Sequence, residues 1–81
     1  MKTQVFGRSK KKASKGGLLV MKEITFVSSP ADLRRIAAFL VKTASVMEEH
    51  GEKFGHRHLQ DEEDLRPFPV GSVDVIVASD Q

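Results

Sequence analysis

Hydrophobic residues follow two different spacings along this chain, and each spacing predicts a different kind of element. Residues 18–27 and 73–78 are rich in Val and other apolar residues, so they predict strands, and residues 3–8 form a shorter strand candidate. Residues 30–50 instead carry one apolar stripe at the period of an α-helix. That stripe consists of Leu33, Ile36, Ala37, Leu40, Ala44 and Met47.

Both ends of the predicted helix are marked by residues that favour a helix boundary. Ser29 suits the N-cap, Pro30 suits the first helical position, and Asp32 stands where the acid of a capping box is found. Gly51 follows His50 and can adopt the left-handed conformation in which many helices end. The sequence therefore predicts a helix over 30–50.

The strands are expected to form one sheet beneath this helix. Gly16-Gly17 suits a tight hairpin turn, which makes the first two strands antiparallel and places Phe6 roughly opposite Val27. Leu18, Val20, Ile24 and Phe26 are expected to meet the helix. The third strand runs either parallel or antiparallel to the second, and a helical turn is expected near 59–65 in the connector.

These elements predict a small α+β fold, with a three-stranded sheet near 3–8, 18–27 and 73–78 and one long amphipathic helix, 30–50, packed on one face. A chain of 81 residues is expected to form a single domain, 1–81. The absence of cysteine excludes disulfides and thiolate metal sites. Since we find neither a membrane-spanning run nor the apolar core of a signal peptide, we expect a cytoplasmic protein without membrane contact.

Charge is divided unevenly along the chain. Residues 1–16 carry six basic residues and no acid, whereas the remainder is acidic overall. The basic segment 7–16, with Lys10, Lys11 and Lys12, is either an edge strand protected from aggregation by lysines or a loop. A nucleic-acid contact is the third interpretation, and the lack of several stacking aromatic residues argues against it.

Two acidic clusters flank the connector that follows the helix. Glu48, Glu49 and Glu52 lie at the helix C-terminus, where the helix dipole disfavours acids. Asp61, Glu62, Glu63 and Asp64 then follow consecutively. Each cluster alone is typical of a solvated surface, but together they also predict an anionic surface for a cationic partner.

Two further features are candidates for partner binding. Phe39 and Val46 lie beside the main stripe, so they either widen the buried face or form an apolar patch for a homodimer or another protein. His56 and His58 lie between the acidic clusters and either bond to the backbone or line a partner surface. We expect no metal site, because a supporting set of ligands is not evident, and no enzyme, because no nucleophile motif or phosphate loop is evident.

The order of these segments resembles one of the families of bacterial polymorphic-toxin immunity proteins, the family numbered 32. The resemblance covers residues 18–78 and lies in the stretches 22–40, 49–59 and 74–77. Its most distinctive part is Phe54-Gly55-His56-Arg57-His58-Leu59. The resemblance implies a small α+β protein that binds and neutralises a cognate toxin.

The leading hypothesis is therefore a non-enzymatic immunity or inhibitor protein without a cofactor, which closes a toxin's site with the acidic connector and the helix end. The alternatives are a small nucleic-acid-binding module that uses the basic N-terminal hairpin, and a homodimeric interaction module that uses Phe39 and Val46.

Overall fold

The computed structural model describes residues 3–9, 18–62 and 73–79. These residues form an α+β structure with one long helix and two antiparallel sheets of two strands each. The elements in chain order are β1 (Gln4–Ser9), β2 (Met21–Val27), α1 (Pro30–His50), the 3-10 turn η1 (Gly51–Lys53), β3 (His56–His58), the 3-10 turn η2 (Leu59–Asp61) and β4 (Ile76–Ala78).

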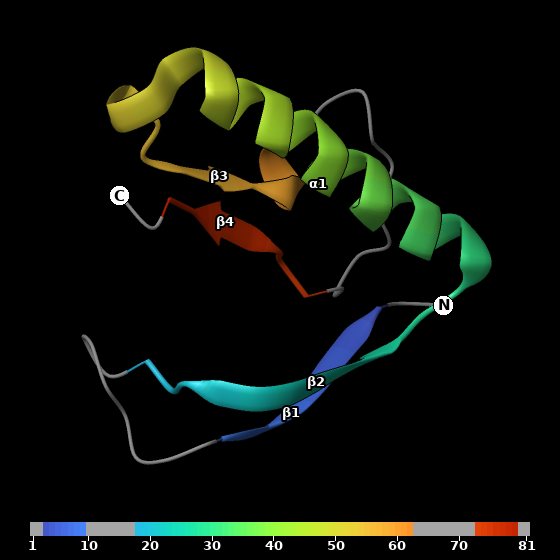
Figure 1. Ribbon diagram of the computed structural model, residues 1–81. Coiled ribbons are helices and arrows are strands. Elements are labelled where there is room, and N and C mark those ends of the chain that lie inside the picture. The colour runs from blue at the N-terminus through green and yellow to red at the C-terminus, as the bar shows by residue number, and fades with distance from the viewer. Residues whose placement is uncertain (1–2, 10–17, 63–72, 80–81) are drawn as a thin grey trace.

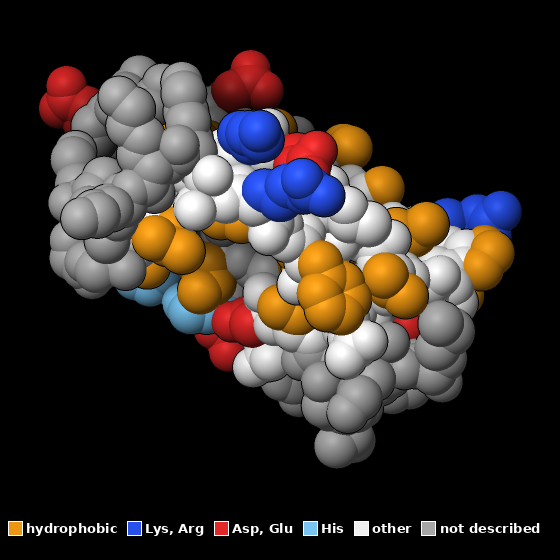
Figure 2. All heavy atoms as spheres, turned by 90° about the horizontal axis from the view of Figure 1, so that it is seen from below, with side chains coloured by type: hydrophobic (Ala, Val, Ile, Leu, Met, Phe, Trp, Pro, Cys, Tyr) orange, Lys and Arg blue, Asp and Glu red, His pale blue; other side chains and the backbone are white. Residues whose placement is uncertain are grey.

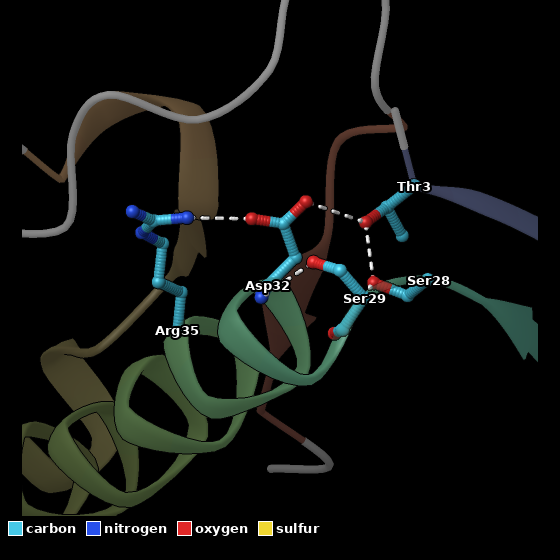
Figure 3. Close-up of polar contacts among 5 residues, drawn as sticks. All are labelled: Thr3, Ser28, Ser29, Asp32 and Arg35. Carbon is cyan, nitrogen blue, oxygen red and sulfur yellow. Dashed lines mark hydrogen bonds and ion pairs between the residues drawn. The ribbon is translucent and has the colours of Figure 1, made fainter. Parts of the chain in front are cut away.

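The helix has the predicted bounds, and its first turn is held by side chains (Figure 3). The backbone N–H of Asp32 donates to Ser29 Oγ at 3.1 Å, which confirms the N-cap. The carboxylate of Asp32 does not act as a capping-box acid. It accepts from Arg35 Nη1 at 2.6 Å and from Thr3 Oγ1 at 3.4 Å, and Thr3 Oγ1 also lies 2.6 Å from Ser28 Oγ. This network joins the start of β1 to the start of α1.

The helix packs on the sheet formed by β3 and β4, with the β1–β2 hairpin on the other side of that sheet (Figure 1). Ile36 and Phe39 of α1 are 4% and 0% exposed and form the core with Leu59, while Val75 and Val77 pack against them. The buried positions of α1 are Asp32, Ile36, Phe39 and Thr43. The predicted stripe is therefore rotated by roughly one residue, or about 100°, from the face that is buried.

This rotation corrects the prediction for several residues. Leu33 and Leu40, expected at the centre of the buried stripe, keep 43% and 44% of their surface exposed. Phe39, interpreted from its spacing as lying beside the stripe, is the most deeply buried residue of the core cluster. The stripe was misplaced because Asp32 and Thr43, which are polar, occupy buried positions that an apolar pattern does not mark.

The sheet is not the predicted single sheet of three strands. β4 pairs antiparallel with β3, a strand that the sequence did not predict because His56-Arg57-His58 contains no apolar residue. One backbone hydrogen bond, from Val73 N–H to the carbonyl of Thr3 at 3.1 Å, reaches from the chain before β4 to the chain before β1. The predicted helical turn is present as η2, which starts at Leu59.

The hairpin of β1 and β2 is antiparallel, as predicted, but its register differs by two residues. Gln4 faces Val27 and Phe6 faces Thr25, with an irregularity between Arg8 and Ser9. Every residue of β2 is exposed, so the expectation that Ile24 and Phe26 meet the helix is wrong. The turn predicted at Gly16-Gly17 lies outside the described residues.

Candidate partner-binding surface at the helix end

The chain turns sharply at the end of α1 because Gly51 adopts a φ of 54°. Its backbone N–H donates to the carbonyl of Met47, and Phe54 N–H donates to the carbonyl of Gly51 at 3.1 Å. The short turn η1 thereby brings Phe54 back beneath the helix, where it is 6% exposed. The chain then enters β3 directly beside the last turn of α1.

This return creates an open hollow of about 420 Å³ between the last turn of the helix and the start of β3. Val46 and Phe54 supply its apolar surface. The remaining lining residues are His50, Lys53, Gly55, His56 and Arg57. We call this feature the helix-end hollow, and its lining combines apolar side chains with imidazole and cationic groups.

Of the two predicted acidic clusters, the structure describes all of the first and part of the second. Glu48, Glu49 and Glu52 are all exposed, and Asp61 is exposed in η2. Glu63 and Asp64 lie outside the described residues. The first acidic cluster therefore lies on the surface, and its residues are neighbours in the sequence of His50 and Lys53, which line the hollow.

Glu62 departs from the predicted anionic surface, because it is buried and paired. Its side chain is 7% exposed, and it accepts from Arg57 Nη2 at 2.8 Å and Nε at 3.2 Å, while Lys42 Nζ lies 3.2 Å from Oε1. Burial acts to raise the pKa of Glu62, but the hydrogen bonds and positive charges of Arg57 and Lys42 outweigh burial and lower the pKa below its usual value. Glu62 thus fastens β3 and η2 to the helix.

The two histidines of β3 have different surroundings. His58 Nδ1 lies 2.6 Å from Asp74 Oδ2, and the other oxygen of Asp74 accepts from Gln60 N–H at 3.1 Å. His58 therefore holds β3 against the chain that leads into β4. His56 is exposed and lines the helix-end hollow, with its ring centre 5.1 Å from that of His58. Of the two, His56 is the one available to a partner.

The proposed surface patch of Phe39 and Val46 is not formed. Phe39 is 0% exposed, so it cannot contact a partner without unfolding of the core. Val46 is half-buried and lines the helix-end hollow. Sequence reasoning missed His50, Lys53 and Arg57 as lining residues. The spacing of Val46 and His50, one helical turn apart, is the signal that places two of the lining residues together.

Other candidate chemistry is sparse in the described part of the chain. Among these residues, no group of three His, Asp or Glu side chains lies close enough to hold a metal ion. Lys10, Lys11 and Lys12 lie outside the described residues, while Arg8 pairs with Glu23 at 2.9 Å. The helix-end hollow is therefore the candidate site that we consider further.

Comparison with known proteins found no matching family model, no matching curated protein and no matching solved structure. Over the residues that the structure describes, α1 is not apolar enough to cross a membrane, and no other helix is long enough.

Proposed function

We propose that this protein is a non-enzymatic immunity protein that binds and neutralises a cognate bacterial toxin through the helix-end hollow. The observation that carries the proposal is the place of the hollow in the sequence. Phe54, Gly55, His56 and Arg57 line it, and they belong to the most distinctive segment of the resemblance to the immunity family. The resemblance and the geometry therefore point to the same few residues.

The composition of the hollow suits a protein partner. Protein interfaces combine an apolar centre with a polar rim, and aromatic residues and arginine are enriched in them. Val46 and Phe54 are the apolar side chains of the lining here, and His56 and Lys53 are among its polar ones. A side chain of the toxin in this hollow would contact apolar groups, and it would meet the hydrogen-bond donors of Lys53 and Arg57.

The exposed acids give the proposed interaction a preferred charge. Glu48, Glu49 and Glu52 favour the approach of a basic surface, because opposite charges accelerate association. Toxins that act on nucleic acid need a basic site, so they are the class that these acids fit best. Glu62 is left out of this role, since Arg57 and Lys42 already neutralise it.

Co-expression tests the proposal. A toxin domain, sought first among the genes that neighbour the gene of this chain, is expressed in a bacterial host with and without this protein, and growth is measured. We expect the wild-type protein to restore growth and His56→Ala to restore it less. Gln60→Ala, a change in η2 outside the hollow, serves as the control. Unrestored growth with a folded wild-type protein contradicts the proposed function.

Binding kinetics with the same toxin domain test the charge. Replacement of Glu48, Glu49 and Glu52 by Gln should slow association roughly tenfold at low salt, with little change in dissociation. Glu23→Gln, which removes an exposed acid from β2, should leave the association rate unchanged. Equal slowing by both variants would show that these three acids have no special role.

A further inference from the structure

The polar side chains that line the helix-end hollow are all hydrogen-bond donors. Four of its seven described lining residues are His50, Lys53, His56 and Arg57, and none of the seven is an acid. Lysine and arginine side chains only donate, and an imidazole has a donor nitrogen in either protonation state. Figure 2 shows histidine side chains (pale blue) at the surface beside hydrophobic ones, toward the end of the molecule at which α1 ends. The hollow therefore suits an acceptor, and best an anionic one.

Lys53 gives the hollow a positive charge that no counterion neutralises. It is exposed in η1, and its side chain forms no ion pair or hydrogen bond within the described part of the chain. The side chains of His50 and His56 also form no hydrogen bond among these residues, although the ring of His56 lies near that of His58. A ligand can bind these groups without breaking an existing polar contact.

Arg57 contributes donors that are already held in position. Its Nε and Nη2 atoms lie 3.2 Å and 2.8 Å from the carboxylate oxygens of Glu62, and this two-point contact fixes the plane of the guanidinium. Its Nη1 atom forms no hydrogen bond among the described residues, so it can donate to a ligand. Because Glu62 offsets the charge of Arg57, the main uncompensated charge of the hollow is that of Lys53.

The apolar part of the lining suits the carbon chain that carries a carboxylate in Asp or Glu. Val46 is half-buried and Phe54 is 6% exposed, and both contribute to the hollow. The methylene groups of an acidic side chain can contact these residues while its single negative charge meets the single charge of Lys53. An acidic side chain thus matches the lining in both polarity and charge.

A phosphate group matches the hollow less well. It carries a charge of about −1.5 to −2 at neutral pH, which exceeds the charge of Lys53. Three exposed acids, Glu48, Glu49 and Glu52, also lie within three residues of Lys53 or His50 in the sequence, and they disfavour a ligand with two negative charges. Charge therefore favours a carboxylate over a phosphate.

We propose that the helix-end hollow binds the carboxylate of an acidic side chain of the toxin, with Lys53 as its counterion and Arg57 Nη1 as a second donor. This inference rests on the proposed function, because it names the group of the toxin that enters the hollow. The exposed acids of the first cluster then meet basic groups that surround this carboxylate. Two neighbouring contacts of opposite sign fix the orientation of the complex, since only one orientation satisfies both.

Titration of the isotope-labelled full chain with two small compounds, followed by NMR, tests the site without a toxin. N-acetyl-glutamate amide should shift the amide signals of residues 50–57 in a saturable way at millimolar concentration. N-acetyl-glutamine amide, which has the same shape without the charge, should bind about tenfold more weakly or less. Lys53→Gln should abolish the difference between the compounds, and Lys22→Gln, a change of an exposed lysine in β2, should preserve it.

Three results of the titration would overturn the carboxylate site. They are the absence of a saturable shift with the glutamate compound, equal binding of the glutamine compound, and tighter binding of inorganic phosphate to the same residues. Because the titration needs no toxin, these results leave the co-expression test undecided. Unrestored growth together with a positive titration would instead keep the carboxylate site and remove the toxin as its source.

Charge reversal tests the contact in the complex. Lys53→Glu should weaken binding of a toxin that this protein neutralises by at least about tenfold, because two carboxylates would then face each other. Replacement by lysine of the toxin acid that enters the hollow should restore binding to Lys53→Glu and weaken binding to the wild-type protein. If no single acid-to-lysine change in the toxin restores binding, the proposed contact is wrong.

Discussion

Hydrophobic residues are exposed in the β1–β2 hairpin and buried in the unit formed by α1, β3 and β4, which we call the helix unit. In the helix unit, Ile36 and Phe39 are 4% and 0% exposed. In the hairpin, Ile24 and Phe26 are 53% and 38% exposed, although their residue types are equally apolar. The difference arises because the chain after the helix returns beneath α1 as β3 and β4, whereas among the described strands β1 and β2 pair only with each other and keep much of their apolar surface exposed. Whether a hydrophobic residue is buried thus depends on whether another segment packs against it, and hydrophobicity alone does not decide it.

The core of the helix unit is small and partly polar. Four hydrophobic residues are buried among the described residues, and so are four polar ones, Thr3, Asp32, Thr43 and Glu62. Buried polar groups stabilise a fold only when they are paired. Asp32 and Glu62 meet this condition through Arg35, Arg57 and Lys42. The helix unit therefore depends on ion pairs as well as on apolar packing.

The largest expected effect comes from two neighbouring residues of α1. Phe39→Ala should lower the free energy of unfolding by about 3–5 kcal/mol, because it leaves a cavity in the core. Leu40→Ala should lower it by less than about 1 kcal/mol, since Leu40 is 44% exposed. Urea unfolding followed by circular dichroism measures both. The opposite ranking would mean that the helix packs through its predicted stripe.

The ion pairs of Glu62 should give the next largest effect, and it should depend on pH. Because the pKa of Glu62 is lowered in the folded state, its ionised form stabilises the fold above the pKa of the unfolded chain. That stabilisation is lost as the pH falls through the folded-state pKa. Glu62→Gln should therefore cost about 1.5–3 kcal/mol at pH 7 and progressively less below about pH 4.

Thermal unfolding across this pH range measures the effect, and Glu49→Gln is the control. Glu49 is exposed on the last turn of the helix, so its replacement should change the melting temperature little at any pH. A Glu62→Gln penalty that stayed constant down to pH 3 would exclude the charge as its cause.

The contrast between the two regions also explains what the sequence predicts well. The helix bounds follow from local signals, Ser29-Pro30 at one end and Gly51 at the other. These signals act within one helical turn, so they do not depend on how the rest of the chain packs. The buried face depends on Asp32 and Thr43, whose burial needs distant partners and a facing sheet. The hydrophobic pattern therefore predicted the helix correctly but placed its buried face about 100° away from the observed one.

The same reasoning explains the candidate site. Glu48 and Glu49 were predicted at the surface from their own chemistry, and they are exposed. For His56 a backbone bond and a place on a partner surface were both open, and its side chain is exposed. Glu62 looks identical to its acidic neighbours in the sequence, yet it is buried because Lys42, twenty residues earlier, lies beside it. The residues of β3 carry no apolar pattern, so this strand could not be predicted from spacing, and of the hollow beside it spacing marks only Val46 and His50.

A glycine substitution should affect the hairpin and spare the helix unit. A Cβ at Gly7 would collide with Met21 Cε and lie 2.8 Å from the carbonyl oxygen of Glu23, so Gly7→Ala must displace the backbone of β2. We expect a local penalty of about 1–3 kcal/mol, seen as faster hydrogen exchange in β1 and β2 with little change in α1. Gly55→Ala is the matched control, because its Cβ meets nothing within 4 Å. Equal acceleration of exchange in α1 would show that the two regions unfold together.

The smallest expected effect is a gain in stability within the core of the helix unit. Thr43 is 0% exposed, and its hydroxyl oxygen has no hydrogen-bond partner among the described residues. An unpaired buried hydroxyl costs free energy, and valine has nearly the same shape without that group. Thr43→Val should therefore raise the free energy of unfolding by about 1 kcal/mol, measured by urea denaturation. Thr43→Ser keeps the hydroxyl and loses the methyl group, so it should instead destabilise the fold by about 1 kcal/mol. Thr43→Val removes the hydroxyl, whereas Thr43→Ser removes the methyl group, so the two variants test the two groups separately. A destabilised Thr43→Val variant would therefore show that the hydroxyl is paired in solution, and that this buried position favours a polar group.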